Sequence, residues 1–242
     1  MNINNYLEIA KGKVNNKFIK TFLLAIYAGM FISLAGLLST VVSLKITNYS
    51  IAKILSGLVF PIGLILVILF KTELFTGNSL LIIPVLNKDI KLKQLLRNWL
   101  IVYIGNFLGA LLIAILIYNT PLKDTISSSI INTVQTKVNY SFIEAMILGL
   151  LCNFLVCISV FLASTVKTTG EKILVIFIPI FMFIALSFEH SIANMLYLSL
   201  GYLLDNTLTI KDILINNLLP VTIGNILGGL FLGVSIWFLK EK

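Results

Sequence analysis

The residues best suited to chemistry in this chain lie inside strongly apolar sequence. The stretch FIALSFEHSIANMLYL, from Phe183 to Leu198, carries the only histidine, His190, directly after Glu189. Ionisable groups at membrane depth cost about 2.5–3.5 kcal/mol on insertion scales, so they usually mark a pathway. Burial favours a neutral imidazole and a neighbouring carboxylate favours a charged one, so His190 is a candidate donor of a proton or hydrogen bond to a solute. The alternative is a core histidine with satisfied hydrogen bonds.

A second polar interruption, FKTELFTGNSLL, resembles a broken helix. Glu73, within it, and Glu189 are expected to accept hydrogen bonds from backbone amides that the breaks leave free, and so to stabilise the loops. Lys137 precedes an apolar run, where it either concentrates anions at a pore mouth or extends to the membrane surface. The other polar candidates within apolar sequence are Lys71, Thr76, Glu144, Asn153 and Asn194.

No metal site, cofactor or catalytic residue is indicated. His190 has no Cys, His or Asp cluster near it that would complete a set of metal ligands. Cys152 and Cys157 are five residues apart in one apolar run, so on a helix they face different ways and predict neither a disulfide nor a metal site. Ser79 lacks the strained Gly-x-Ser-Gly context of an intramembrane serine protease. We therefore do not expect an enzyme.

Membrane helices must position these groups, because 58% of the 242 residues are hydrophobic and 12% are charged. A soluble domain has about 25% charged residues. Six apolar runs approach or exceed the roughly 20 residues that span a bilayer core, and no signal-peptide pattern precedes the first. We expect an all-α integral membrane protein, a single domain over residues 1–242, with six transmembrane helices of which the second and fifth are broken. The runs are 18–38, 51–70, 96–118, 141–164, 172–204 (interrupted) and 213–239.

The net charge of +8 follows the expected topology. With the N-terminus inside, twelve basic residues fall on the cytoplasmic side and five in outer loops, as the positive-inside rule requires. The prediction is a multi-pass protein of the cell inner (cytoplasmic) membrane with both termini in the cytoplasm; a nucleic-acid partner is not expected. The inner set includes Lys13, Lys20, Lys88, Lys172, Lys240 and Lys242, and the outer set is Lys45, Lys53, Lys123, Lys137 and Lys211.

The two halves of the chain resemble each other. The pattern Ile-Gly-Asn-x-Leu-Gly occurs at Ile104–Gly109 and again at Ile223–Gly228, 119 residues later. The Glu and Asn of ELFTGN recur in EHSIAN at an offset of 116. Repeats of about 18–118 and 141–239 each hold three spans, so the second is inverted, an arrangement that builds transporters with a site at the repeat interface. The repeated glycines are expected to serve close helix packing.

The chain resembles the formate/nitrite transporter family along essentially its full length. The matching stretches are KTFLLAIYAGMFISLAG, FPIGL, ELFTGN, RNWLIVYIGNFLGAL, FIEAMILGLLCNFLVC and FEHSIANM, in that order. The resemblance implies an aquaporin-like fold, a homopentamer in the lipid bilayer, and passage of small monovalent anions or their weak acids through each protomer. Formate is the first expected substrate, with hydrosulfide or nitrite as alternatives within the family.

The resemblance also implies roles for individual residues. It assigns Phe60 and Leu64 to an outer apolar constriction, and Leu74 and Phe183 to a constriction on the other side. One departure is Lys71, where the family usually has glycine: this lysine either extends to the cytoplasmic face or adds a cation near the pore. The implied substrate-binding residues are His190 and Asn153 in the pore, Thr76 in the break of the second span, and Lys137 in the outer vestibule.

Two other classes of channel fit less well. An aquaporin-like channel for neutral solutes would share the inverted repeat, but no Asn-Pro-Ala occurs in the chain. An ammonium channel would be expected to have paired pore histidines, and this chain has one histidine.

Overall fold

The computed structural model describes residues 3–240, and these residues form helices joined by loops, without a β-strand. Lys240 is therefore placed, whereas Lys242 lies outside the described residues. The helical segments, including a 3₁₀ turn (η1) and a π-helical stretch (η2), are α1 (Asn4–Asn15), α2 (Phe18–Ser43), α3 (Tyr49–Val59), α4 (Pro61–Leu69), η1 (Gly77–Leu81), α5 (Ile82–Leu86), α6 (Leu92–Tyr118), α7 (Leu122–Val138), α8 (Phe142–Thr165), α9 (Thr169–Ala185), α10 (Ser191–Leu204), η2 (Asp212–Leu218) and α11 (Leu219–Phe238).

Five stretches of helix in the described part of the chain are long and apolar enough to cross a membrane. They are Phe18–Ser43, Tyr49–Leu69, Leu92–Tyr118, Phe142–Thr165 and Asp212–Phe238. The remaining expected span corresponds to α9 and α10, two shorter helices separated by a loop, so the count of six stays a prediction. Both predicted breaks are present: one lies between α4 and η1, and the other lies between α9 and α10.

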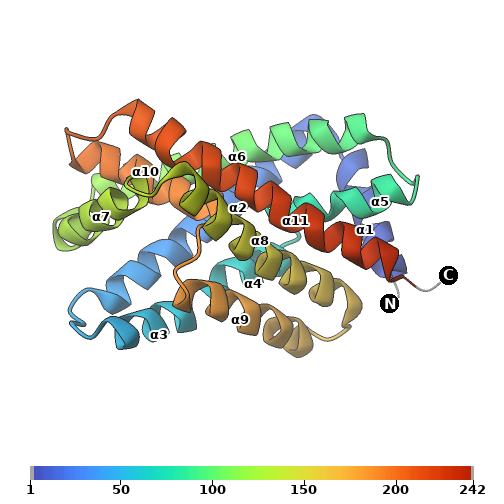
Figure 1. Ribbon diagram of the computed structural model, residues 1–242, viewed down its shortest axis with the longest axis horizontal. Coiled ribbons are helices and arrows are strands. Elements are labelled where there is room, and N and C mark those ends of the chain that lie inside the picture. The colour runs from blue at the N-terminus through green and yellow to red at the C-terminus, as the bar shows by residue number, and fades with distance from the viewer. Residues whose placement is uncertain (1–2, 241–242) are drawn as a thin grey trace.

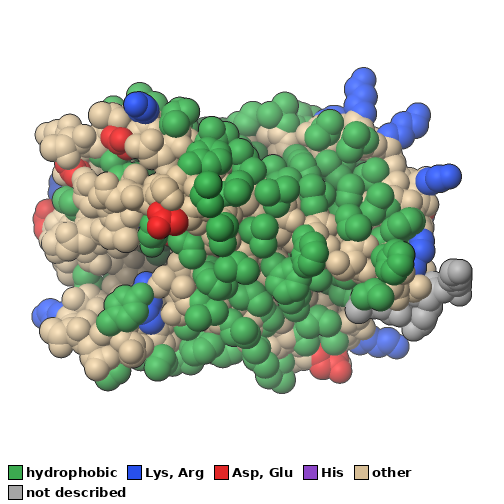
Figure 2. All heavy atoms as spheres, viewed as in Figure 1, with side chains coloured by type: hydrophobic (Ala, Val, Ile, Leu, Met, Phe, Trp, Pro, Cys, Tyr) green, Lys and Arg blue, Asp and Glu red, His purple; other side chains and the backbone are tan. Residues whose placement is uncertain are grey.

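The molecule has two distinct ends. Figure 1 places α1, α5 and the last turns of α11 at one end, and α7 with part of α10 at the other; we call these the α1 end and the α7 end. Figure 2 shows hydrophobic side chains over the middle of the visible face, with lysine and arginine side chains projecting at the α1 end. Large exposed apolar residues include Ile19, Leu100, Leu116, Leu174 and Phe231. This belt is the surface expected of a protein in contact with lipid.

The glycines repeated in α6 and α11 serve close packing, as predicted. A Cβ atom on Gly109 would lie 2.1 Å from the carbonyl oxygen of Ile26 in α2. A Cβ atom on Gly228 would lie 2.1 Å from the carbonyl oxygen of Leu150 in α8. The pairs α2–α6 and α8–α11 therefore approach through equivalent small residues.

The helix α7 was not anticipated from the sequence, which suggested only a loop between the third and fourth spans. It is too polar to stand out as an apolar run, but Ile126, Ile130 and Val134 recur every four residues and are buried on one face. The side chain of Val134 packs against Gly201 of α10: a Cβ atom added to Gly201 would lie 2.7 Å from the Val134 side chain. This helix positions Lys137 in its last turn.

Candidate pore and its two helix breaks

The first break begins with a residue in the left-handed region of backbone space. Lys71 has φ 53°, and around it the N–H of Thr72 donates to Val67 O (2.9 Å) and the N–H of Lys71 donates to Ile68 O (3.1 Å). This pair of bonds is a Schellman helix end, in which the left-handed position is usually glycine. A lysine there carries strain of roughly 1–2 kcal/mol.

The second break repeats this geometry. Ser187 has φ 57°, the N–H of Phe188 donates to Phe183 O (3.0 Å), and the N–H of Ser187 donates to Ile184 O (3.0 Å). Lys71 and Ser187 are 116 residues apart, the same offset as Glu73 and Glu189. The first helix of each broken span, α4 or α9, therefore ends with a residue in the left-handed (αL) conformation.

Two asparagines satisfy the backbone that the breaks leave open. Asn106 of α6 accepts the N–H of Phe75 at its Oδ1 (2.9 Å) and donates from Nδ2 to Ala25 O (2.7 Å) and Glu73 O (2.9 Å). Its side chain therefore bridges α2 to the loop. Because free backbone groups are tolerated at membrane depth only when protein or water satisfies them, this side chain permits the break.

Asn225 of α11 does the same at the second break. Its Oδ1 accepts the N–H of Ser191 (2.9 Å), and its Nδ2 donates to Gly149 O (2.8 Å) and Glu189 O (3.0 Å). Both asparagines are fully buried and belong to the repeated Ile-Gly-Asn pattern. Within that pattern, only the glycines had a role predicted from the sequence.

The carboxylate of Glu73 holds together a buried polar cluster. It accepts from Asn78 Nδ2 (2.6 Å) and from Lys13 Nζ (3.1 Å), and Asn78 Nδ2 also donates to Asn98 Oδ1 (2.8 Å). Both donors to this carboxylate are side chains, and the loop N–H of Phe75 is bound by Asn106. Glu73 rather ties α1, through Lys13, to the break.

Glu189 repeats the cluster toward the α7 end. It accepts from Asn194 Nδ2 (2.6 Å) and from Lys137 Nζ (2.7 Å), and Asn194 Nδ2 donates to Asn217 Oδ1 (2.8 Å). Lys137, expected in an open vestibule, has a side chain only 13% exposed and paired with this carboxylate. The donors to Glu189 are again side chains.

His190 joins the two breaks. Its Nδ1 accepts the N–H of Ala193 (3.1 Å), which caps the start of α10, and its Nε2 lies 3.0 Å from Thr76 Oγ1 in the other break. Because Nδ1 is the acceptor, the proton of the neutral ring sits on Nε2 and is donated to Thr76. The Thr76 hydroxyl then retains its own proton for a further acceptor.

Asn153 lies next to the backbone of Thr76. Its Nδ2 faces three acceptors, Thr76 O (3.2 Å), Ser79 Oγ (3.2 Å) and Asn225 O (2.5 Å), and the residue lines neither of the two cavities described below. An amide has two hydrogens to donate, and these three protein acceptors lie within reach of them. Asn153 therefore holds the Thr76 backbone, and its direct contact with a solute stays a prediction.

An apolar constriction surrounds the imidazole. A cavity of about 10 Å³ lies between the side chains of Phe60, Leu64, Leu74, Phe183, His190 and neighbouring Ile32, Val156 and Ile180. That volume is about what one water molecule needs. The rings of Phe60 and Phe183 meet edge to face at 5.5 Å, and the ring of Phe183 stacks on that of His190 at 5.9 Å.

The grouping of these four apolar residues differs from the one expected. Leu64 and Leu74 both line a second, larger cavity at the α1 end, whereas Phe60 and Phe183 do not. The leucines therefore face the α1 end, and the two phenylalanines, in contact with each other, lie deeper. The break explains the difference, because it folds Leu74 back beside Leu64 of α4.

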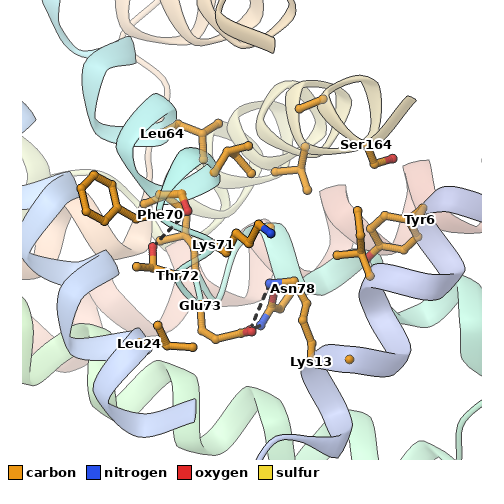
Figure 3. A pocket seen from close by; sticks show the side chains of 18 of the residues that line it. Tyr6, Lys13, Leu24, Leu64, Phe70, Lys71, Thr72, Glu73, Asn78 and Ser164 are labelled. Carbon is orange, nitrogen blue, oxygen red and sulfur yellow. Dashed lines mark hydrogen bonds and ion pairs between the residues drawn. The ribbon is translucent and has the colours of Figure 1, made fainter. Parts of the chain in front are cut away.

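The larger cavity has a volume of about 540 Å³ and is lined by residues of α1, α2, α4, α8 and α9 together with the first break and the start of η1. Figure 3 shows it from close by, with Lys71 extending among Leu64, Glu73 and Asn78. Tyr6 of α1 also lines it and is buried. Glu144, another candidate, is exposed and forms a capping box with Ser141 at the start of α8. Within residues 3–240, no group of three His, Cys, Asp or Glu side chains is placed to hold a metal.

Comparisons with known proteins agree with this geometry. The sequence model of the formate/nitrite transporter family matches residues 2–238. The chain is 34% identical to the formate channel FocA of Escherichia coli (strain K12), over 93% of this chain and 88% of that protein. It is 35% identical to a probable formate transporter of Methanothermobacter thermautotrophicus, over 96% and 94% of the two chains.

Two solved structures share the fold. A pentameric formate channel with formate bound superimposes with a TM-score of 0.81 at 33% identity, covering 92% of this chain and 97% of that chain. An ion channel of the FNT family superimposes with a TM-score of 0.84 at 27% identity, covering 98% and 96%.

Proposed function

This chain belongs to the formate/nitrite transporter family, and we propose on that basis that it is a membrane channel for formate, carried as the anion or as formic acid. The observation that carries the proposal is the hydrogen bond between His190 and Thr76 beside an apolar cavity of about 10 Å³. A polar donor at the centre of an apolar slit suits a small solute that needs one strong hydrogen bond and little space. Hydrosulfide and nitrite have similar size and charge and are the alternatives within the family.

The apolar slit opposes a bare anion, because removing charge from water without a partner is costly. In the proposed mechanism, the Thr76 hydroxyl donates to a formate oxygen, and the Nε2–H of His190 donates to Thr76 Oγ1, which strengthens that hydroxyl as a donor. Because the cap of α10 occupies Nδ1 of His190, release of the Nε2 proton would leave an anionic ring. The ring therefore acts by hydrogen bonding, and the proton of formic acid comes from water.

The charged clusters at the two ends complete the pathway. Lys13 and Lys137 are paired with Glu73 and Glu189, so each presents a partly neutralised cation, and the clusters hold the breaks in shape while formate passes. The α1 end, rich in lysine, is assigned to the cytoplasm by the positive-inside rule. With this orientation both termini lie in the cytoplasm, and the protein is a multi-pass protein of the cell inner membrane.

A homopentamer is the proposed assembly, supported by the pentameric formate channel that shares the fold. The pore runs within each protomer, since His190, Thr76 and the constriction all come from one chain. The exposed apolar belt then divides between lipid and neighbouring protomers.

The experiment is anion flux in proteoliposomes containing the purified protein. Formate uptake well above that of empty liposomes supports the proposal, and competition among formate, nitrite and hydrosulfide ranks the substrates. A neutral-solute channel is the rival: rapid glycerol or water permeation without formate flux would overturn the proposal.

A further inference from the structure

The cavity at the α1 end carries an excess of positive charge that the pore described above does not use. Four lysines line it, namely Lys13, Lys20, Lys71 and Lys172, and Glu73 is the one acidic residue among its described lining residues. The lining therefore has a net charge of +3. Glu73 is already bound to Lys13 and Asn78, so it does not offset the other three lysines by direct contact.

Lys71 is the most informative of these lysines. It is exposed to the cavity, and its ammonium group makes neither a hydrogen bond nor an ion pair with any residue between 3 and 240. It also holds φ at 53°, a conformation that glycine would adopt without strain. Strain held at a non-glycine residue is most often kept where the side chain has a use, and no hydrogen bond or ion pair of this side chain with a described residue supplies one.

The position of Lys71 suggests that use. Its side chain extends into the cavity in Figure 3, and Leu74, three residues later, lines both this cavity and the small one beside His190. A lysine ammonium here lies on the route between water at the α1 end and the leucine constriction. Clefts lined by one sign of charge raise the local concentration of the opposite ion.

We propose that Lys71, with Lys20 and Lys172, forms a capture site for a small monovalent carboxylate in the α1-end cavity, which loads the pore from that side. The inference rests on the proposed function and adds to it a direction: the channel takes up its substrate at lower concentration from the α1 end than from the α7 end. At the equivalent position of the other break stands Ser187, which carries no charge. The asymmetry is therefore built into the two αL residues.

The test compares Lys71→Gln with Lys88→Gln. Lys88 is a matched control because it is also an exposed lysine with positive φ, at 64°, in the loop after α5, and it does not line the cavity. Formate uptake is measured in inside-out and right-side-out membrane vesicles at low salt. Lys71→Gln is expected to raise the KM for formate uptake from the α1 end about threefold to tenfold. The KM for uptake from the α7 end should not change. Lys88→Gln should change neither KM. At about 0.5 M salt the difference in KM between Lys71→Gln and the unchanged protein should disappear.

A second pair of variants separates charge from strain. Lys71→Gly and Ser187→Gly both relieve a strained αL residue, so each is expected to raise the thermal midpoint of the protein. Only Lys71→Gly is expected to raise the KM from the α1 end. If the two variants give equal KM values, or if Lys71→Gln behaves as Lys88→Gln does, the capture site is wrong.

A binding measurement keeps this inference apart from the proposed function. In purified protein, sodium formate should raise the thermal midpoint relative to sodium gluconate at equal ionic strength, and the increase should be smaller in Lys71→Gln than in Lys88→Gln. Absence of formate flux in wild-type vesicles would count against the channel, whereas an equal thermal shift in the two variants would count against the capture site alone.

Discussion

Asn106 and Asn225 close the two helix breaks with the same three hydrogen bonds. Each accepts one backbone N–H at 2.9 Å and donates to two backbone carbonyls, one in the loop and one in the first helix of its own repeat. Each asparagine sits on an unbroken helix, α6 or α11. The broken spans are therefore held by side chains of their intact neighbours, and the breaks depend on those two residues.

Replacing Asn225 by alanine should destabilise the protein strongly. Three buried backbone groups lose their partner, at about 1–3 kcal/mol each, and Asn106→Ala should have a similar effect. Thermal unfolding in detergent measures the change. Asn119→Ala is the control, because Asn119 is exposed at the end of α6 and its side chain donates to Ile115 O of its own helix. If Asn225→Ala unfolds at the same temperature as Asn119→Ala, the role given to the asparagine is incorrect.

Lys137 and Glu189 should show strong energetic coupling. Lys137→Met leaves a buried carboxylate without its cation, which typically costs about 3–5 kcal/mol. Adding Glu189→Gln should recover much of that loss, because the amide oxygen still accepts from Asn194 and no charge remains buried. A double-mutant cycle of unfolding free energies measures the coupling. Additive effects of the two substitutions would contradict the buried ion pair.

Gly228→Ala should disturb the packing of α11 on α8. The new Cβ would meet the Leu150 carbonyl oxygen at 2.1 Å, so a helix must move, at about 1–3 kcal/mol. Gly170→Ala is the matched control, since its Cβ would meet no atom within 4 Å, and it should be neutral or slightly stabilising. Thermal midpoints of the two variants decide; equal values would exclude the close approach.

The docking of α1 should depend on pH through Asp89. A hydrogen bond from Asn87, and next the pairing with Lys11 at 2.7 Å, hold the pKa of the Asp89 carboxyl below its usual value. A lowered carboxyl pKa contributes stability above the unfolded value of about 3.9 and loses it as the pH falls through the folded value.

Hydrogen exchange of α1 measures this docking. Protection of α1 should be constant from about pH 7 to 5 and decline below about pH 4. Asp89→Asn should lower the protection at pH 7 and flatten its pH dependence. The same decline in wild-type protein and in Asp89→Asn would assign the effect to another group.

The sequence predicted the parts of the fold that depend on composition and repetition. Long apolar runs identified the spans, and polar interruptions around Glu73 and Glu189 located both breaks. The helix α7 was not predicted, because its apolar face consists of three buried residues on an otherwise polar helix. Asn106 and Asn225 were visible within the repeated Ile-Gly-Asn pattern, but their hydrogen bonds to loops distant in sequence could not be inferred from spacing.

The pore was harder to predict than the fold. Residue spacing cannot show that Leu74 lies beside Leu64, or that the amide of Asn153 donates to backbone carbonyls. Both features follow from how the two breaks meet. Equally, the sequence left the role of His190 open between proton transfer and hydrogen bonding. The choice depends on whether Nδ1 accepts a hydrogen bond at the start of α10, and that bond follows from the three-dimensional path of the backbone, which residue spacing does not show.

The central claim, that the Nε2–H of His190 acts through Thr76, is tested most directly by formate flux through His190→Asn in proteoliposomes across a range of pH. Asparagine is a good helix cap, so it can accept the Ala193 N–H and preserve α10 while removing the ring donor. We expect formate flux through His190→Asn to fall about tenfold, as the loss of about 1.4 kcal/mol of stabilisation implies. Flux through Thr76→Val should fall as far, whereas Thr76→Ser should retain its flux. Unchanged flux with unchanged pH dependence in His190→Asn would contradict the account.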